Sequence, residues 1–386
     1  MKFKLRDYQK SIVRQGSKIL KNHNLLYLAM EVRTGKTFTS LGICNKIKSN
    51  NVLFITKKKA ISSIEDDFET LKPNYKITVI NYESLHKIST DQHFDVLILD
   101  EAHSIGAYPK KNKRCLQIQS LILIHNPKVI LLSGTPTPES FSQMYHQVCS
   151  IPGNPFSDYT RGRDSILKEM KPYTISFTQK EAGFVVDTNE EVLSVDLEDS
   201  TKEMIKTLNK DRILKGSEEV VLADTPVKLM TKTHQLCSGT VKFESGKSQV
   251  VDYSKANFIY KKFSNKKIGI FYKFKEELNA LKKVYKDDLC IDLETFNSTN
   301  KTIALQIVSG REGISLRKAE ALIYYNIDFS ATSYWQSRDR MTTKDRLYNK
   351  IYWIFSKGGI ESDIYKAVIK KKDYTLNHFK RDSLNL

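Results

Sequence analysis

Short apolar runs alternate with stretches of helical periodicity along the first half of the chain. The runs predict buried strands at Leu25 to Met30, Val52 to Thr56, Ile77 to Ile80, Val96 to Leu99 and Val129 to Leu132. Between the first two runs, Phe38, Leu41, Cys44 and Ile47 recur at a spacing of three, which predicts one face of a helix. Buried strands separated by helices are typical of a parallel sheet with helices on both faces.

A second α/β pattern occupies the last part of the chain. Its strand candidates are Ile268 to Phe271, Leu289 to Ile291, Ile303 to Val308, Leu322 to Tyr325 and Ile351 to Phe355. We therefore expect an α/β fold of two lobes with parallel sheets, residues 1–188 and 189–386. The polar stretch at about 197–263 predicts a mostly helical segment at the start of the second lobe. A cleft between two such lobes is a usual place for a ligand.

Composition and charge narrow the function classes. No apolar run approaches the roughly 18 residues that span a bilayer, and the charged N-terminus has no apolar signal region, so no membrane partner is expected. The five cysteines form no CxxC pair, which favours a reducing cytoplasm. The net charge of +18 favours a polyanionic partner, because Lys and Arg release counterions from phosphates. The alternative explanation of the positive charge is a lysine-rich surface that is only solvated and binds no polyanion.

The segment Thr34-Gly35-Lys36-Thr37 follows a predicted strand and opens a predicted helix. In that context, backbone N–H groups and the positive end of the helix face an anion. Lys36 would then reach the β- and γ-phosphates of a nucleotide, and the Thr37 hydroxyl would bind Mg²⁺. The full pattern GxxxxGKT has glycine where this chain has Met30, and a lone Gly-Lys-Thr also occurs in ordinary turns.

Two adjacent carboxylates, Asp100 and Glu101, follow the apolar strand that ends at Leu99. Asp100 can hold Mg²⁺ through its water shell, and Glu101 can orient and deprotonate an attacking water. An acidic turn after a buried strand would explain either residue alone. Both motifs, in order, on two strands of one predicted sheet, favour a nucleotide site. The Gly/Pro segment 133–138 follows a later strand of the same sheet.

Together these motifs resemble those of superfamily-two DEAH-motif helicases of the Swi/Snf-like branch, in the compact form found in bacteriophages. In the first lobe the resemblance rests on residues 5–9 (LRDYQ), 31–37 (motif I), 52–58 (Ia), 79–85 (around Ib), 100–103 (DEAH, motif II) and 133–136 (III). In the second lobe it rests on residues 229–239 (a helical region), 267–274 (IV), 306–316 (V), 334–340 (VI) and 358–364 (a closing segment). The resemblance therefore covers nearly the whole chain in order.

This resemblance implies two RecA-like lobes that hydrolyse ATP between them, with Mg²⁺, to move along or remodel duplex or branched DNA. DNA would be bound mainly through its backbone, RNA is the less favoured partner, and the protein would act as a monomer in the cytoplasm (that of the host, if viral). The resemblance implies that the catalytic residues are Lys36, Glu101, Gln336 and Arg340. It implies that Gln9 contacts the adenine and that the nucleotide is also bound by Val32, Arg33, Thr34, Gly35, Lys36, Thr37, Gly313 and Arg338. The implied metal ligands are Thr37 and Asp100.

Three departures from the family pattern stand out, two of them in the first lobe. Met30 and Arg33 place bulky side chains in the phosphate loop, where relatives often carry glycine. Thr56 and Lys57 occupy positions where motif Ia usually shows proline. The first departure bears on nucleotide affinity, because a bulky residue in this loop can crowd the phosphates.

The third departure lies in motif VI, which usually reads QxxGRxxR. Asp339 takes the place of the glycine and Thr343 that of the second arginine, so one of the two usual arginines is missing. We expect Arg340 to contact the γ-phosphate, with Arg338 the next candidate and Arg346 the third. Pairing of Arg338 and Arg346 with nearby acids or with DNA phosphates is the alternative.

Other functions explain parts of the pattern. An ATP-binding clamp that holds nucleic acid and recruits a partner, with little turnover, would explain the altered motifs but has no need of Glu101 as a base. A P-loop kinase would leave the second lobe unexplained. Strand-separating helicases, duplex translocases and branch-migration enzymes differ by a wedge element, and no motif in the sequence marks one.

Overall fold

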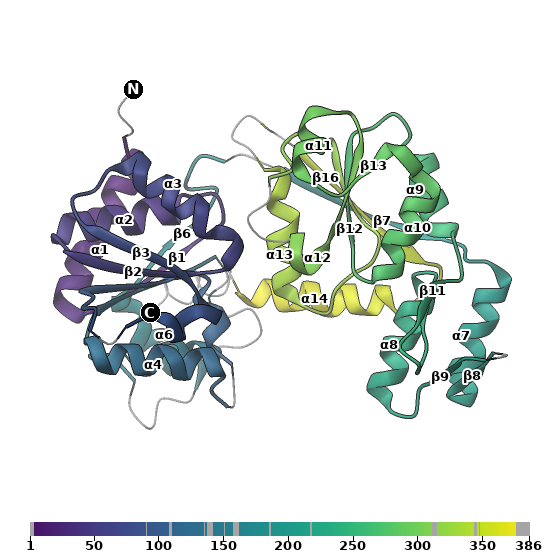
Figure 1. The fold of residues 1–386 in the computed structure, drawn as a ribbon, viewed down its shortest axis with the longest axis horizontal. Coiled ribbons are helices and arrows are strands. Elements are labelled where there is room, and N and C mark those ends of the chain that lie inside the picture. Colours follow the sequence, from purple (N-terminus) through teal and green to yellow (C-terminus); the bar gives the residue numbers. More distant parts are fainter. Residues whose placement is uncertain are drawn as a thin grey trace. The chain divides into compact units, whose positions relative to one another are not determined.

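A computed structural model describes residues 4–375 of the chain, except residues 90, 108–109, 135, 137–141, 150, 157–161, 185–186, 217, 311–314, 343–345 and 347. The chain divides into two compact units, with the division between Phe184 and Val185 (Figure 1). The second unit runs from Val185 to Lys370. The sequence-based division at 188/189 falls within strand β7 (Asp187–Val195), which belongs to the sheet of the second unit.

Unit 1 is an α/β lobe built on one parallel sheet. Its elements are α1 (Asp7–His23), β1 (Leu25–Met30), α2 (Lys36–Ile47), β2 (Asn51–Thr56), η1 (Lys58–Ala60), α3 (Ile61–Leu71), β3 (Lys76–Asn81), η2 (Tyr82–Lys87), β4 (Val96–Leu99), η3 (Ala102–Ile105), α4 (Lys113–His125), β5 (Lys128–Ser133), α5 (Ser142–Val148), α6 (Arg163–Met170), η4 (Lys171–Tyr173) and β6 (Thr174–Phe177). Within the described part of this unit, six strands pair in the order β3-β2-β4-β5-β1-β6, all parallel.

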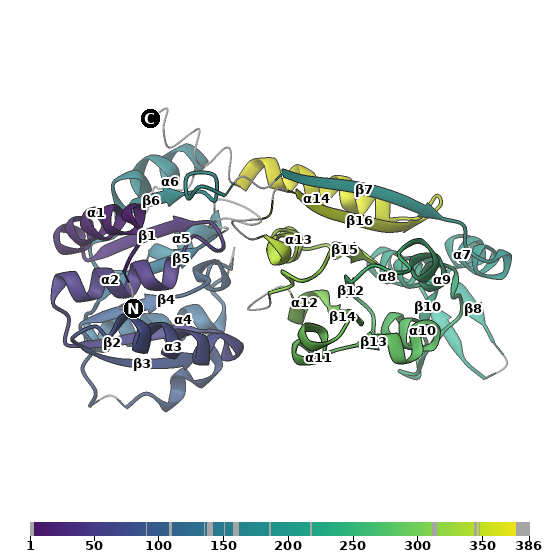
Figure 2. The ribbon, with the colours of Figure 1, turned by 90° about the horizontal axis from the view of Figure 1, so that it is seen from above.

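Helices cover both faces of this sheet. Side chains from α1, α2 and α3 form one apolar cluster with it, and α4, α5 and α6 contribute to the cluster on the other face (Figures 1 and 2). The central strands β1 and β4 are buried along their whole length, as expected for a parallel sheet covered on both sides. The predicted strands and the helix through Phe38 are therefore confirmed.

Unit 2 is a second α/β lobe. Its elements are β7, α7 (Asp199–Asp211), β8 (Ile213–Lys215), β9 (Val220–Leu222), α8 (Pro226–Cys237), β10 (Thr240–Lys242), β11 (Ser248–Val250), α9 (Ser254–Lys262), β12 (Ile268–Tyr272), α10 (Lys275–Tyr285), η5 (Lys286–Asp288), β13 (Leu289–Cys290), α11 (Leu293–Ser298), β14 (Thr302–Gln306), α12 (Ile307–Gly310), β15 (Ala321–Tyr324), α13 (Ala331–Arg338), η6 (Asp339–Met341), β16 (Tyr348–Ser356) and α14 (Glu361–Thr375).

The large sheet of unit 2 is also parallel. Among its described residues, six strands pair in the order β13-β14-β12-β15-β16-β7. β7 and β16 run side by side over their full length, and α14 lies along them (Figure 2). The predicted fold class is thus confirmed for both lobes. The segment that precedes β12 contains the expected helices α7, α8 and α9, and also two short antiparallel pairs, β8–β9 and β10–β11. No helix in the described ranges is both long and apolar enough to cross a membrane.

A buried ion pair ties the end of unit 2 to its interior. Lys255 Nζ on α9 lies 2.6 Å from Glu361 Oε1 on α14, with side-chain exposures of 1% and 0%. The Ser356 hydroxyl donates a hydrogen bond to Glu361 Oε2 at 3.0 Å. A Cβ on Gly359 would lie 2.1 Å from that same oxygen, so only glycine lets the chain turn tightly enough to place Glu361. Each charge is therefore compensated mainly by its partner.

Replacing Glu361 by alanine is expected to lower the stability of unit 2 by about 3–5 kcal/mol, because it leaves a buried ammonium without a counterion. Both tryptophans, Trp335 and Trp353, lie in unit 2, so denaturant unfolding followed by their fluorescence measures the change. Asp363→Ala on the same helix is the control, since its pair with Lys366 is exposed and is expected to contribute little. Equal losses for the two variants would contradict the prediction.

Candidate active site

The phosphate loop joins the buried end of β1 to the start of α2. Gly35 adopts a left-handed conformation, with φ of 79°, and a Cβ there would lie 2.3 Å from Gln9 Nε2. Only glycine therefore fits at this position. Arg33 also has a positive φ, of 64°. The turn exposes backbone N–H groups at the N-terminus of α2, the arrangement that binds phosphate.

Helix α1 supports the loop on one side. Gln9 Nε2 donates a hydrogen bond to the Gly35 carbonyl at 3.3 Å, and Gln9 Oε1 accepts one from the Arg6 N–H at 2.9 Å. The Tyr8 hydroxyl donates to the Thr34 carbonyl at 3.0 Å. Gln9, expected at the adenine, is thus buried and attached directly to the phosphate loop.

The segment after β6 supports the other side of the loop. The Gln179 N–H donates to Glu31 Oε2 at 2.7 Å, and Gln179 Nε2 donates to the Val32 carbonyl at 3.0 Å. The Glu31 N–H donates to the Phe177 carbonyl. These bonds hold the shape of a loop that lacks the usual glycines at Met30 and Arg33. Sequence reasoning missed Gln179, because no local spacing relates it to the loop.

Motif II begins where β4 ends. The Thr56 hydroxyl, at the end of the neighbouring strand β2, donates to Asp100 Oδ2 at 2.8 Å. The Tyr82 hydroxyl donates to the Asp100 carbonyl at 2.5 Å. Burial raises the pKa of Asp100 to about 6, the Glu101 charge adds to this, and the Lys36 charge acts in the opposite direction. A nearby cation, such as a metal ion, would favour the ionised form further.

The catalytic candidate Glu101 has a left-handed backbone, with φ of 50°, which is uncommon outside glycine. His103 Nδ1 lies 3.4 Å from Glu101 Oε2 and 3.1 Å from Ser133 Oγ. His103 therefore connects motif II with the first residue of motif III. Farther along motif III, the Pro136 carbonyl accepts a hydrogen bond from Gln147 Nε2 at 2.9 Å.

Motifs I, II and III meet at the carboxyl edge of the sheet in unit 1. Lys36 Nζ donates to the Met30 carbonyl at 3.0 Å. A Cβ on Gly134 would lie 3.5 Å from both Lys36 Nζ and the Val32 nitrogen, so motif III approaches the phosphate loop closely. The structure thus brings together the predicted residues Lys36, Asp100 and Glu101, which a nucleotide site requires.

These residues fit a magnesium–nucleotide complex. The Thr37 hydroxyl and the Asp100 carboxylate offer oxygen ligands, which Mg²⁺ prefers. In the part of the chain that the structure describes, no three His, Cys, Asp or Glu side chains form a metal-binding group.

The remaining predicted site residues belong to unit 2. Arg338 pairs with Glu190 of β7, with Arg338 NH2 2.8 Å from Glu190 Oε1. Arg346 NH2 donates to the Ala319 carbonyl at 2.6 Å. Arg340 is half-buried, and its carbonyl accepts from the Leu316 N–H of motif V at 2.8 Å. The other two predicted residues cannot be placed in this way, because Gly313 and the side chain of Gln336 lie outside the described residues.

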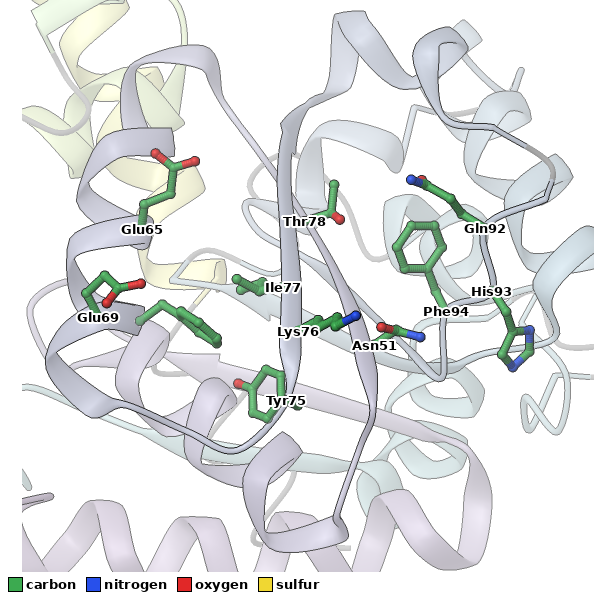
Figure 3. A pocket seen from close by; sticks show the side chains of 11 residues that line it. Asn51, Glu65, Glu69, Tyr75, Lys76, Ile77, Thr78, Gln92, His93 and Phe94 are labelled. Carbon is green, nitrogen blue, oxygen red and sulfur yellow. The ribbon is translucent and has the colours of Figure 1, made fainter.

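A hollow of about 740 Å³ lies elsewhere in unit 1 (Figure 3). It is lined by residues at the beginnings of strands, such as Asn51 and Lys76, and by Glu65 and Glu69 of α3. The motif residues lie at the opposite, carboxyl ends of the same parallel strands. The hollow therefore does not form part of the candidate active site.

Two family profiles match parts of the chain. The profile of the SNF2-related domain matches residues 43–240, just over half of the chain. The chain belongs to the SNF2-related family. A second profile, that of the type III restriction enzyme res subunit, matches residues 2–76 of this SNF2-related chain. The predicted Swi/Snf-like resemblance is confirmed at the level of the family.

Individual relatives are distant. Helicase SWR1 of Candida glabrata and Helicase SWR1 of Saccharomyces cerevisiae are 23% and 22% identical to the SNF2-related chain over 213 residues. The matched region is 47% of this chain but 13% and 12% of those relatives, so the chain spans only a small part of their length. The solved SWI2/SNF2 ATPase core of Sulfolobus solfataricus in complex with dsDNA aligns over 100% of this chain and 95% of that one, with 15% identity and a TM-score of 0.44.

Proposed function

We propose that this SNF2-related chain is an ATP-dependent DNA helicase or translocase that moves along or remodels duplex or branched DNA. The observation that carries the proposal is the meeting of Lys36 with the half-buried Asp100–Glu101 pair at one edge of the sheet. A protein that only binds a nucleotide has no need of a carboxylate base at the phosphates. Family membership adds the expectation that turnover depends on DNA.

Each residue of unit 1 has a defined task in this proposal. Lys36 and the backbone of residues 32–35 bind the phosphates, and Gln9 contacts the adenine. Thr37 and Asp100 hold Mg²⁺, which when bound neutralises charge on the β- and γ-phosphates. Glu101 orients the attacking water and takes its proton. His103, in contact with both Glu101 and Ser133, links this base to motif III.

Unit 2 would supply positive charge to the transition state. We assign this task to Arg340, with Gln336 and Gly313 also at the nucleotide. Arg338 is the second candidate, but its pair with Glu190 favours a structural task. A cation at the γ-phosphate can accelerate phosphoryl transfer by about 10³–10⁵-fold.

The nucleic acid would be bound through its phosphates. The net charge of +18 supports a polyanionic partner, and residues of motifs Ia, Ib, IV and V are the expected contacts. Duplex or branched DNA is favoured over RNA by the family. An ATP-binding clamp that recruits a partner is the competing function, and it differs by having little turnover.

ATP hydrolysis is expected to be stimulated by DNA, most strongly by duplex or forked DNA. Steady-state ATPase rates with single-stranded, double-stranded and forked DNA, and with RNA of equal length, measure this.

DNA affinity is expected to fall about 10³-fold or more between roughly 50 and 200 mM salt if six or more phosphates are contacted. Tight ATP and DNA binding without turnover would favour the clamp. A DNA affinity that does not change with salt would indicate that the positive charge only solvates the surface.

A further inference from the structure

Two hydroxyl groups from outside the phosphate loop contact motif II. Thr56 Oγ1 lies 2.8 Å from Asp100 Oδ2, and the Tyr82 hydroxyl lies 2.5 Å from the Asp100 carbonyl oxygen. Thr56 and Tyr82 are both buried, with exposures of 0% and 1%. They come from β2 and η2, so two separate elements hold one residue of motif II.

The contact of Thr56 follows from strand register. β2 and β4 are parallel neighbours in which Ile55 pairs with Leu99, so Thr56 and Asp100 are the next residues along each strand. The Asp100 N–H continues the ladder by donating to the Ile55 carbonyl at 2.9 Å. Because the hydroxyl engages Oδ2, it fixes the rotation of the carboxylate and leaves Oδ1 directed elsewhere. A buried strand end of this kind would accommodate valine, so the hydroxyl is not required for packing alone.

Tyr82 acts on the backbone instead of the side chain. Its hydroxyl binds the carbonyl of Asp100, which belongs to the peptide group that precedes Glu101. The orientation of that peptide sets the φ angle of Glu101, which is 50° in a region that residues other than glycine rarely adopt. A strained backbone of this kind persists when surrounding bonds hold it in place.

We propose that Thr56 and Tyr82 are positioning residues of motif II, in which Thr56 aims the Asp100 carboxylate at the metal and Tyr82 holds the peptide that orients Glu101. The inference rests on the proposed function. It assigns a task to Thr56, a residue at which this chain departs from the usual motif Ia. Partners of this kind around a metal ligand typically change metal affinity or activity by about 10–100-fold when removed.

Variants that each remove one hydroxyl test the proposal. Thr56→Val and Tyr82→Phe keep the shape of the side chain, and Thr56→Ser restores the hydroxyl. Matched controls in the same unit are Thr174→Val, which loses a bond to the Met170 carbonyl, and Tyr75→Phe, which loses one to the Leu41 carbonyl. The measurements are ADP affinity by calorimetry as a function of Mg²⁺ concentration, kcat and KM for ATP with DNA, and the melting temperature.

Thr56→Val is expected to raise the Mg²⁺ concentration needed for ADP binding by about 10–100-fold, and Thr56→Ser to restore it. Tyr82→Phe is expected to lower kcat by a factor of about 10–100 while KM for ATP changes little. The proposal is overturned if the two variants match their controls in Mg²⁺ dependence and in kcat. Parent turnover in the same assay tests the proposed function separately, because the Mg²⁺ dependence of ADP binding reports on Thr56 even without hydrolysis.

Discussion

Replacing Glu101 by glutamine is expected to lower kcat for ATP at least about 100-fold while leaving ATP affinity within about twofold of the parent value. The amide has nearly the shape of the carboxylate, so the fold around His103 and Tyr82 is retained. It cannot accept a proton from the attacking water. Steady-state ATPase rates at saturating ATP and DNA, with ATP affinity from calorimetry, measure the two quantities independently.

Lys36→Ala provides the contrast to this variant. This substitution removes the Lys36 ammonium group, which is expected to contact the β- and γ-phosphates, so ATP affinity itself is expected to fall. The two variants therefore separate binding from hydrolysis. Parent-level turnover by Glu101→Gln would show that Asp100 and Glu101 do not form motif II.

Replacing Arg340 by alanine is expected to lower kcat by about two or more orders of magnitude at saturating ATP and DNA. The other two candidate arginines, Arg338 and Arg346, make contacts within unit 2 that support its fold. Glu190 binds Arg338 and also accepts hydrogen bonds from Tyr334, Trp353 and Tyr365, which makes the pair part of a packed cluster. Arg346 donates to backbone carbonyls, including that of Ala319.

Arg338→Ala and Arg346→Ala are therefore expected to lower the melting temperature more than kcat. Loss of Arg338 leaves the Glu190 carboxylate largely buried without its counterion, which is costly for stability. Melting temperatures measured beside the ATPase rates distinguish the two kinds of effect. If Arg340→Ala kept a near-normal kcat while Arg338→Ala or Arg346→Ala lost most of its kcat, this chain would be aligned differently with the family pattern of motif VI.

Most strands of the two sheets were predictable because they are apolar along their length, but β6 and the polar strand β7 were not among the predicted strands. Leu25 to Met30 and Val96 to Leu99 are buried on both faces, and each is followed at once by polar residues. The carboxyl ends of parallel strands meet at one edge, so motifs placed at strand ends lie near one another. Lys36 and Glu101 do lie close enough to Asp100 for their charges to act on the pKa of its carboxyl group.

Other features leave no local signal in the sequence. The strands β8 and β9 contain three residues each, too few to show a period of two, and their pairing depends on the register of Ile213 with Leu222. The Glu190–Arg338 pair joins residues far apart in the chain, and no spacing rule connects them. The bond between Thr56 and Asp100 depends on the register of β2 with β4, which an apolar pattern does not specify.

The pairing of β7 with β16 has a consequence for synthesis on the ribosome. The strands of unit 1 are complete by Phe177, whereas β7 must wait for Tyr348–Ser356 before its partner exists. At about 5–20 residues per second, that delay is on the order of ten seconds or more. During this time the nascent strand exposes unpaired backbone groups, which are prone to wrong associations. The first lobe can thus fold co-translationally, while the sheet of the second closes only after Tyr348–Ser356 has been synthesised.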